Sequence, residues 1–507
     1  MIRIRFALSG ILAAIAGIAA GHLVAGFVDP ATSPVLTIGS TVIDLTPTPV
    51  KEWAIAHFGT NDKTILLGSV VFVTLLAAAL VGLLARGHRR LAVALIALLV
   101  VVPGAAALTR PTFTLLDLVP PAVTLVVGLA SFVWLTSLAG SADPDHSAAA
   151  VRPGRSTAAR REFLGGALGV VVLSALAGVG GQLRAGAQAA KRLVLPAPTD
   201  PAPAFPTGLD RKVPGISPLR TPTDTFYRVD TNLAVPQVDV DRWTLQIDGM
   251  VDKPFSLTFE ELAAMPLIER DITMTCVSNE VGGGYIGAAR WLGVRLSDVL
   301  DRAGITGSPD QLLSTAVDGF RISTPLDVVR DGRDAMIAIA MNGEQLPAAH
   351  GYPARLITPG LYGFVGATKW LTKLTVTTYA AEQAYWTTRQ WATDAPIKTS
   401  ARVDTPRPLS TIPAGKTAIG GVAWAQHRGV GKVEVRIDDG AWQQTELGPE
   451  VNIDYWRQWY LPWDAKPGLH RIAVRAVDLK GAVQTADRAT PFPSGSSGIQ
   501  EVVVTVE

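Results

Sequence analysis

Five long apolar stretches in the first third of the chain constrain the fold more than any other feature of the sequence. Each is about 18 to 24 residues long, the length that an α-helix needs to cross the hydrocarbon core of a bilayer. The chain has 507 residues, more than one hydrophobic core usually organises, so several structural units are expected. Residues 1–185 are therefore predicted to form an anchor of five transmembrane helices. The predicted spans are residues 6–27, 65–85, 91–108, 115–138 and 163–183.

Basic residues cluster on one side of these spans. Cytoplasmic loops carry an excess of Lys and Arg, so the clusters place the N-terminus inside the cell. With five crossings, everything after about residue 183 lies outside, and the predicted location is the cytoplasmic membrane with an extracytoplasmic globular part. The loop expected over residues 31–50 contains no Lys or Arg, which agrees. The clusters are Arg3 and Arg5; Arg86, His88, Arg89 and Arg90; and Arg152, Arg155, Arg160 and Arg161.

Two features surround the fifth span. The pair Arg160-Arg161 precedes it and resembles a twin-arginine signal, which exports proteins already folded around a cofactor. Two ordinary positive-inside arginines would give the same pattern, so both interpretations stay open. After the span, seven prolines between residues 196 and 218 exclude a helix or a central strand. Residues 186–218 are therefore predicted to be a stiff Pro-rich linker that holds the globular part near the membrane.

Composition narrows the class of function. The net charge is only +2, and no Lys/Arg stripe with interleaved aromatic residues is present, so nucleic acid is excluded as a partner. The sequence contains one cysteine. A single cysteine excludes an intrachain disulfide, a CxxCH haem site, a four-cysteine iron–sulfur cluster and a zinc finger. Any redox cofactor must need at most one thiolate.

The single cysteine, Cys276, lies at the end of a predicted strand over residues 271–276, which follows a short predicted helix over residues 258–264. A loop with three consecutive glycines, Gly282 to Gly284, comes next and permits close approach of the backbone to a ligand. A lone cysteine is more often a small buried apolar residue. The local pattern alone therefore leaves a structural and a ligating role open.

Six short motifs in a fixed order resemble the sulfite oxidase family of molybdopterin enzymes, most closely bacterial, actinobacterial-like members with an N-terminal membrane anchor. The resemblance covers nearly all of residues 221–507. It implies an α+β molybdopterin domain of the sulfite oxidase type over residues 219–395. The motifs are TPTDTFYR at residues 221–228, CVSN at 276–279, ARWLGV at 289–294, HGYPAR at 350–355, PG at 359–360 and KW at 369–370.

The resemblance implies a cofactor and a set of residues that hold it. In this family molybdenum is bound by one pyranopterin and one cysteine, so Cys276 is the implied metal ligand and catalytic centre. Each basic position taken singly is equally consistent with a structural or surface role. The implied cofactor-binding residues are Asp224, Phe226, Tyr227, Arg228, Cys276, His350, Arg355, Gly366, Ala367, Thr368 and Lys369, with Asp318 as a less secure contact.

The sequence departs from the family pattern beside the cysteine. Sulfite-oxidising members carry two arginines four and five residues after it, where this chain has Glu280 and Val281. An acidic residue there would repel sulfite. Trp391 replaces the family's active-site tyrosine, and Arg389 and Arg457 are candidates for orienting an oxygenated substrate. A neutral or cationic S-oxide or N-oxide, such as methionine sulfoxide in a protein, suits this pattern better than sulfite.

The C-terminal region, residues 396–507, is predicted to be all-β. Strands are expected over residues 418–424, 432–437, 442–447, 456–463, 470–476 and 499–506. The resemblance implies an immunoglobulin-like β-sandwich, and a homodimer through it is the predicted assembly.

The predicted function is oxygen-atom transfer at a cysteine-ligated Mo-molybdopterin centre, on a small-molecule or protein-borne substrate. Electrons would be exchanged with a separate redox partner, since no haem or flavin motif is visible. Two alternatives remain: an S-oxide or N-oxide reductase on the same cofactor, and a membrane-tethered β-rich binding module without enzymatic activity.

Overall fold

The computed structural model describes residues 2–58, 61–108, 113–141, 155–187 and 191–507, which fall into two compact units. One unit holds the N-terminal helices together with Thr231–Gln237, and the other holds Ala190–Asp230 and Val238–Glu507. The predicted basic residue Arg152 lies outside the described residues, as do residues 188–190 of the predicted linker.

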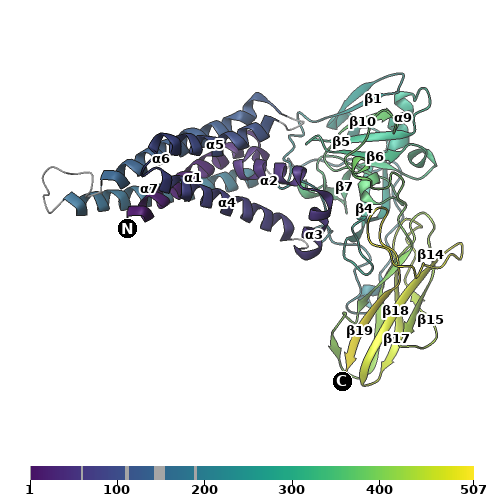
Figure 1. Ribbon diagram of the computed structural model, residues 1–507. Coiled ribbons are helices and arrows are strands. Elements are labelled where there is room, and N and C mark those ends of the chain that lie inside the picture. Colours follow the sequence, from purple (N-terminus) through teal and green to yellow (C-terminus); the bar gives the residue numbers. More distant parts are fainter. Residues whose placement is uncertain (1, 59–60, 109–112, 142–154, 188–190) are drawn as a thin grey trace. The chain divides into compact units, whose positions relative to one another are not determined.

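Five helices of the N-terminal unit are long and apolar enough to cross a membrane. Within this unit α1 contacts α4, α6 and α7, and these helices run along one another (Figure 1). Glycines allow the close approach, because a Cβ on Gly10 would lie 1.9 Å from the Ala78 carbonyl oxygen and one on Gly82 would lie 2.2 Å from that of Phe6. The helices are α1 Ile2–Val28, α4 Asp62–Leu84, α5 Arg89–Leu108, α6 Val119–Ser141 and α7 Arg155–Ala187.

The predicted loop over residues 31–50 is wrong. Two helices occupy this part of the chain, α2 Pro34–Leu45 and α3 Thr48–Phe58, together with the short turn η1 Pro30–Thr32. At 12 residues α2 is apolar but too short to span a bilayer, so a search for long apolar stretches passes over it. Its start follows from Ser33 before it and Pro34 at its first turn. The short η3 Leu115–Leu118 also precedes α6.

Two five-stranded sheets form the first half of the second unit. They share one core, to which Trp291 and Ile339 contribute from one sheet and Leu245 and Leu374 from the other. The first sheet has the order β3-β4-β7-β8 with β9 also paired to β7, and the second has the order β2-β1-β10-β5-β6. The strands are β1 Thr244–Gly249, β2 Phe255–Thr258, β3 Leu267–Thr275, β4 Ile286–Arg295, β5 Gln311–Ala316, β6 Arg321–Pro325, β7 Met336–Met341, β8 Glu344–Gln345, β9 Arg355–Ile357 and β10 Leu371–Thr377.

Short helices connect these strands. The predicted helix over residues 258–264 is confirmed as α8 Phe259–Ala263, because Thr258 and Glu261 cap its first turn reciprocally. The remaining helices are α9 Leu296–Ala303, α10 Gly363–Gly366, η5 Leu209–Arg211, η6 Val328–Arg330, η7 Ala348–His350 and η8 Thr387–Arg389.

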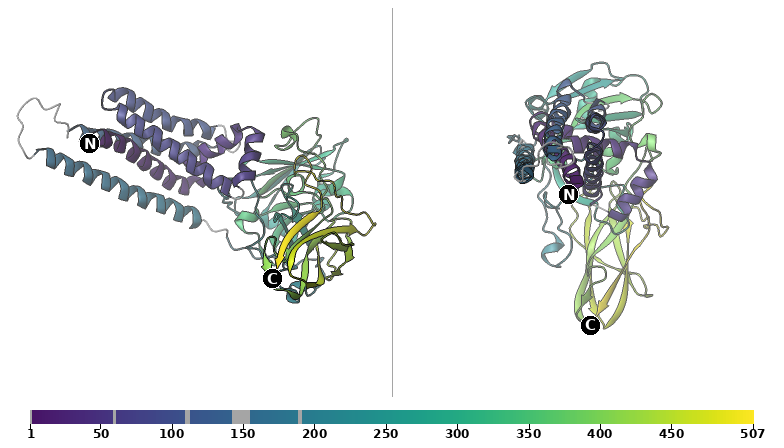
Figure 2. Two further views of the ribbon diagram at one scale, coloured as in Figure 1. Left: turned by 60° about the horizontal axis from the view of Figure 1, so that its bottom comes forward. Right: turned by 60° about the vertical axis from the view of Figure 1, so that its left-hand side comes forward.

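The C-terminal half of this unit consists of two further sheets that enclose a common apolar core (Figure 2). The sandwich agrees with the prediction, whereas its immunoglobulin-like topology stays a prediction. One expected strand, over residues 442–447, is wrong as a single element. It divides into β15, which pairs with β14 in one sheet, and β16, which pairs with β17 in the other. The strands are β11 Ser400–Thr405, β12 Thr411–Ile412, β13 Gly415–Trp424, β14 Val430–Ile437, β15 Gln443–Gln444, β16 Glu446–Leu447, β17 Arg457–Ala465, β18 Gly468–Asp478 and β19 Gln500–Val506.

The sandwich packs against the first half of this unit. A third core joins Val277 and Leu361 of the first half to Trp424 and Trp456 of the sandwich. Gln426 Nε2 also donates to the β3 carbonyl of Thr273 (3.1 Å). The sandwich is therefore part of the surroundings of β3, the strand that ends at the cysteine.

The predicted stiff linker does not stand apart from the globular unit over residues 191–218, because this segment lies on that unit. The Thr199 amide donates to the Leu267 carbonyl (2.9 Å), and Asp200 forms a parallel bridge with Ile268. Prolines bar this segment from a sheet interior but leave its carbonyls and remaining amides free to pair along an edge. Further along, Gln458 accepts a hydrogen bond from the Leu209 amide (2.6 Å).

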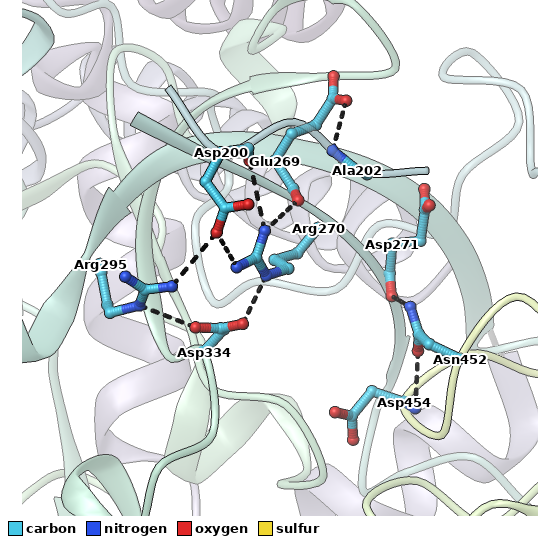
Figure 3. Close-up of polar contacts among 9 residues, drawn as sticks. All are labelled: Asp200, Ala202, Glu269, Arg270, Asp271, Arg295, Asp334, Asn452 and Asp454. Atoms are coloured by element: carbon cyan, nitrogen blue, oxygen red, sulfur yellow. Dashed lines mark hydrogen bonds and ion pairs between the residues drawn. The ribbon is translucent and has the colours of Figure 1, made fainter. Parts of the chain in front are cut away.

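An ion-pair network fixes the start of this segment (Figure 3). Arg270 contacts Asp200 and Asp334, each at 2.5 Å, and Arg295 contacts Asp334 at 2.8 Å. Burial disfavours the ionised form of Asp334, but the hydrogen bonds and charges of the two arginines outweigh it and hold the pKa of this carboxyl below its ordinary value.

Replacing Asp334 by Asn tests this network. A carboxyl whose pKa is lowered on folding contributes stability above its unfolded pKa, and the contribution is lost as the pH falls through the folded pKa. We expect Asp334→Asn to lower the free energy of unfolding by roughly 1 to 2 kcal/mol at pH 7. The difference should shrink between about pH 4 and pH 3, as followed by tryptophan fluorescence in thermal melts. Asp464→Asn, in an exposed pair with Lys466, is the control, and an unchanged gap at pH 3 would contradict the assignment.

Candidate functional site

Cys276 directly follows the last residue of β3 and begins a closed loop. Its amide donates to the Tyr285 carbonyl (2.9 Å), and the Asn279 amide donates to the Cys276 carbonyl (3.0 Å). The side chain is buried, and the Ser278 amide donates to Sγ at 3.4 Å. Burial raises the pKa of the Cys276 thiol, an effect that the Ser278 hydrogen bonds and the charge of Lys369 oppose.

The glycines after Cys276 serve the loop itself. Gly282 has a φ of +79°, which favours glycine. A Cβ on Gly283 would lie 2.7 Å from Asn279 Oδ1, the atom that accepts a hydrogen bond from the Tyr285 amide (2.8 Å). Gly284 has open space around its Cα. Two of the three glycines are therefore explained by the turn, and the ligand approach predicted for this loop stays a prediction.

Aromatic rings from the segment before β1 lie over this region. The Phe226 ring stacks on Tyr227 with centroids 5.2 Å apart, and meets His350 and Trp291 edge-on at 5.6 and 5.9 Å. Burial, with the charge of a Cys276 thiolate as the second cause, raises the pKa of Tyr227. The predicted residues Phe226, Tyr227 and His350 are thus brought together beside the cysteine.

Three basic residues also belong to the candidate site. They are Arg228, Arg355 and Lys369, and we call them the basic cluster. Arg355 is buried, its Nη1 donates to the His350 carbonyl (3.1 Å), and burial lowers its pKa to about 10. Lys369 Nζ contacts Asp230 at 3.0 Å, and burial lowers its pKa to about 8. Arg228 pairs with the same carboxylate at 2.8 Å.

The cluster carries more positive charge than the protein neutralises. In the described part of the chain, Asp230 pairs with Arg228 and Lys369, whereas no ion pair is present for Arg355 and its Nε has no hydrogen-bond partner. His350 does not help, because burial and then the charges of Arg355 and Lys369 lower its pKa to about 4 and keep it neutral. A buried guanidinium without an ion-pair partner is destabilising, and a bound anion would compensate its charge.

The other predicted cofactor contacts fall into two groups: residues 366–368 lie beside Arg355, and Asp224 and Asp318 do not share these contacts. Gly366 ends α10, and Ala367 and Thr368 follow it. The Thr368 carbonyl accepts from the Leu356 amide of β9 (2.8 Å), and the Thr368 hydroxyl pairs with Ser314 (2.6 Å). This places them beside Arg355. Asp224 is exposed, and Asp318 accepts from the Phe320 amide (3.0 Å) within the turn between β5 and β6. The contacts described for Asp318 are local.

The three residues predicted to face the substrate have different surroundings. Trp391 packs edge-on against Phe364 of α10, with centroids 5.5 Å apart. Arg389 lies over the Tyr385 ring at 3.5 Å. Arg457 belongs to β17 and is held by the Gly448 carbonyl (2.8 Å) and Glu450 (2.6 Å). Its described contacts are those of the sandwich, so orienting the substrate is not part of the function proposed below for Arg457.

Two residues near the cysteine were missed by the sequence. Asp230 supplies the carboxylate of the basic cluster, and its place two residues after Arg228 gives no signal without the ion pairs. Tyr362, at the N-terminal cap of α10, is buried. Burial raises the pKa of Tyr362 to about 12, with a Cys276 thiolate adding to the rise.

Comparisons with known proteins agree with this geometry. Residues 232–386 match the family described as "Oxidoreductase molybdopterin binding domain". The mitochondrial sulfite oxidase of Homo sapiens is 30% identical over 312 residues, covering 51% of this chain and 56% of that protein. The nitrate reductase [NAD(P)H] of Hordeum vulgare is 28% identical over 328 residues, covering 53% of this chain and 36% of that protein.

A solved structure extends the likeness. The crystal structure of the sulfane dehydrogenase SoxCD from Paracoccus pantotrophus is similar with a TM-score of 0.50 and 25% identity, covering 57% of this chain and 83% of that chain. The chain spans about half the length of the curated sulfite oxidases it matches. The family match includes Cys276, Arg355 and Lys369, and it begins four residues after Arg228. This part of the chain is therefore a molybdopterin-binding oxidoreductase domain, similar to that of the sulfite oxidases.

Proposed function

We propose that the chain carries a single-pyranopterin molybdenum cofactor whose metal is ligated by Cys276, and that it performs oxygen-atom transfer. The observation that carries the proposal is the buried, uncompensated charge of Arg355, which interacts electrostatically with Tyr227, as does the buried Cys276. When bound, the cofactor supplies a metal that exchanges an oxygen atom with the substrate as two electrons are transferred.

The phosphate of the pterin is the anion that suits the basic cluster. Arg355 offers a planar guanidinium for a bidentate contact, and Lys369 and Arg228 add charge. The phosphate would neutralise the charge that Asp230 leaves uncompensated. Phe226 and Tyr227 provide flat apolar surface for the pterin ring, and the backbone of residues 366–368 provides further contacts.

Cys276 is suited to be a metal ligand that loses its proton, and so becomes a thiolate, only when the metal binds. Its pKa is raised by burial, so the free chain holds the proton, and binding of a metal would release it. The Ser278 amide at 3.4 Å and the charge of Lys369 favour the thiolate once formed. The loop hydrogen bonds of Asn279 hold the sulfur in position.

The surrounding unit is proposed to lie outside the cytoplasmic membrane, anchored by the five apolar helices with the N-terminus inside. The basic residues between α4 and α5 support this orientation, since Arg86, Arg89 and Arg90 lie at one end of both helices. Electrons would pass to or from a separate carrier, since no haem or flavin motif is visible in the sequence.

Replacing Cys276 by Ser tests the metal ligand. The hydroxyl is a poorer ligand than a thiolate, so we expect the full-length protein to fold with an unchanged melting temperature but to lose at least about 100-fold in turnover with a reduced viologen. Molybdenum is measured by elemental analysis of the detergent-extracted protein. Met274→Leu, a conservative change in the core on the same strand, should keep both metal and activity. Full molybdenum content and activity in Cys276→Ser would remove the cysteine from its role.

Two matched arginine variants test the anion site. Arg355→Met should lower the amount of retained pterin at least about tenfold, because a charge-assisted phosphate contact is lost. The melting temperature of the cofactor-free protein should not fall, since the variant removes a buried charge that lacks a carboxylate. Arg457→Met changes an arginine of the sandwich and should leave pterin content unaltered. Equal loss of pterin in both variants, or a large loss of apoprotein stability in Arg355→Met, would contradict the phosphate site.

Cysteine labelling tests the orientation in the membrane. Gly87 is exposed between α4 and α5, with open space around its Cα, and Lys466 is exposed in the sandwich. In intact cells a membrane-impermeant maleimide should label Lys466→Cys and not Gly87→Cys, while native Cys276 is buried and stays unlabelled. Permeabilised cells should label both. The reverse pattern would place the catalytic unit inside the cell.

A further inference from the structure

Two residues placed on either side of Cys276 are held by the sandwich. Thr273 of β3 lies three residues before the cysteine, and Asn279 lies three residues after it. We call residues 276–285 the cysteine loop. Asn279 determines the shape of this loop, because its amide donates to the Cys276 carbonyl (3.0 Å) and its Oδ1 accepts from the Tyr285 amide (2.8 Å). A shift of Asn279 would therefore move the backbone of Cys276.

The strand before the cysteine is bound by two connections of the sandwich. The Thr273 amide donates to the Asp454 carbonyl (3.0 Å), and its hydroxyl accepts from the Trp456 amide (2.8 Å). The Thr273 carbonyl accepts from Gln426 Nε2 (3.1 Å). Asp454 and Trp456 belong to the connection between β16 and β17, and Gln426 belongs to the one between β13 and β14. The backbone that leads into Cys276 is thus fixed from the sandwich.

Two other segments of the sandwich hold the backbone after the cysteine. Ser496 Oγ, in the connection between β18 and β19, donates to the Asn279 carbonyl (2.5 Å). Arg402 Nη1, on β11, donates to the Gly283 carbonyl (2.9 Å). These partners are 217 and 119 residues apart in the sequence. Both contacts therefore depend on the folded sandwich.

Arg402 is itself rigidly placed. Its side chain is only 13% exposed, its Nε contacts Asp404 at 2.6 Å, and its Nη2 donates to Ser217 Oγ (2.8 Å). The Ser217 amide in turn donates to Asp404 (2.9 Å). All three nitrogen atoms of the guanidinium are engaged, so Arg402 cannot follow the cysteine loop if the loop moves.

A third residue of the sandwich fills the space beside the loop. Gln500, the first residue of β19, is buried, and its Oε1 accepts from the Val403 amide (2.7 Å). A Cβ on Gly282 would lie 2.4 Å from Gln500 Nε2. The Gln500 side chain therefore lies directly against the Gly282 backbone and limits movement of the loop toward the sandwich.

We propose that the sandwich sets the position of the Cys276 sulfur, and that Ser496 and Arg402 are positioning residues that act through the cysteine loop. This inference rests on the proposed function. A metal ligand on a loop needs its surroundings to fix it, because a small displacement of the ligand changes the geometry of the metal. The sandwich then acts on the reaction through the metal ligand. A purely structural role of the same contacts would change the stability of the unit and leave the sulfur unaffected.

The first test measures how often the cysteine loop opens in the full-length chain, prepared in cells that do not make the pterin. The sequence contains one cysteine and its side chain is buried, so the rate of its reaction with iodoacetamide reports this opening. Ser496→Ala should raise the rate about tenfold, because a hydrogen bond that holds the loop is lost. Arg402→Met removes a charged donor to the same loop and should raise the rate at least as much.

Matched variants serve as controls. Ser497 is the next residue in the same connection, but its hydroxyl donates to the Asp487 carbonyl (2.7 Å), outside the cysteine loop. Arg475 of β18 pairs with Glu434 at 2.7 Å. Ser497→Ala and Arg475→Met should keep the rate within about twofold of the unaltered chain, with melting temperatures that fall as much as those of the test variants. Ser496→Thr retains the hydroxyl and should restore most of the protection.

The second test uses the molybdenum-loaded, detergent-extracted chain. Half-reduced molybdenum gives an electron paramagnetic resonance signal whose g-values depend on the orientation of the coordinated sulfur. Ser496→Ala and Arg402→Met should shift these g-values, while molybdenum and pterin content stay within about twofold of the unaltered chain. Ser496→Thr and the two controls should give the unaltered signal.

Rates of thiol reaction in Ser496→Ala and Arg402→Met that match those of the controls would overturn the inference. An unaltered resonance signal in both variants would do the same, because the sulfur would then keep its position without these contacts. If the unaltered chain never holds molybdenum or pterin, the proposed function is overturned. The labelling rates would still decide whether the sandwich holds the loop.

Discussion

The buried charge of Arg355 is the constraint on which the rest of the site depends. A guanidinium with no carboxylate partner in the described chain destabilises its surroundings unless an anion arrives. Among the described residues, the carboxylate that forms ion pairs with the basic cluster is that of Asp230, which is shared between Arg228 and Lys369. The protein therefore holds a region of positive potential at the edge of two sheets. Affinity for an anionic cofactor follows from the fold, at some expense to the stability of the cofactor-free chain.

The sandwich contributes to this site as directly as the sheets that contain the cysteine. Arg402 of β11 donates to the Gly283 carbonyl (2.9 Å), and its other nitrogens contact Asp404 and Ser217. The same arginine thus joins the cysteine loop, the sandwich and the Pro-rich segment. Together with Ser496 on Asn279, it limits the motion of the loop that carries the sulfur. A ligand on a short, otherwise exposed loop needs such support to hold a metal in one geometry.

Much of the fold and of the candidate site could be predicted from the sequence. The features that could not be predicted were missed for identifiable physical reasons. Cys276, His350, Arg355 and Lys369 could be found because they lie in short motifs. The long apolar spans could be found because each is about long enough to cross the hydrocarbon core of a bilayer as a helix. The partner of Lys369, Asp230, could not, because an ion pair between residues 139 positions apart leaves no local pattern. The position of the predicted linker was missed for the opposite reason. Proline content correctly excludes regular structure, but it does not indicate whether the extended chain lies free or along a sheet edge.

The order in which the site can form follows from these separations. Tyr227, Cys276, Arg355 and Lys369 come from segments spread over more than a hundred residues, and the cysteine loop is further held by Ser496 near the C-terminus. None of these segments forms the proposed cofactor site alone, so the site is complete only after the sheets and the sandwich have packed. A cofactor held in this way is bound by a folded chain. Binding of a cofactor by a folded chain would suit export of an already folded unit, so it fits the interpretation of Arg160-Arg161 as a twin-arginine signal, which stays a prediction.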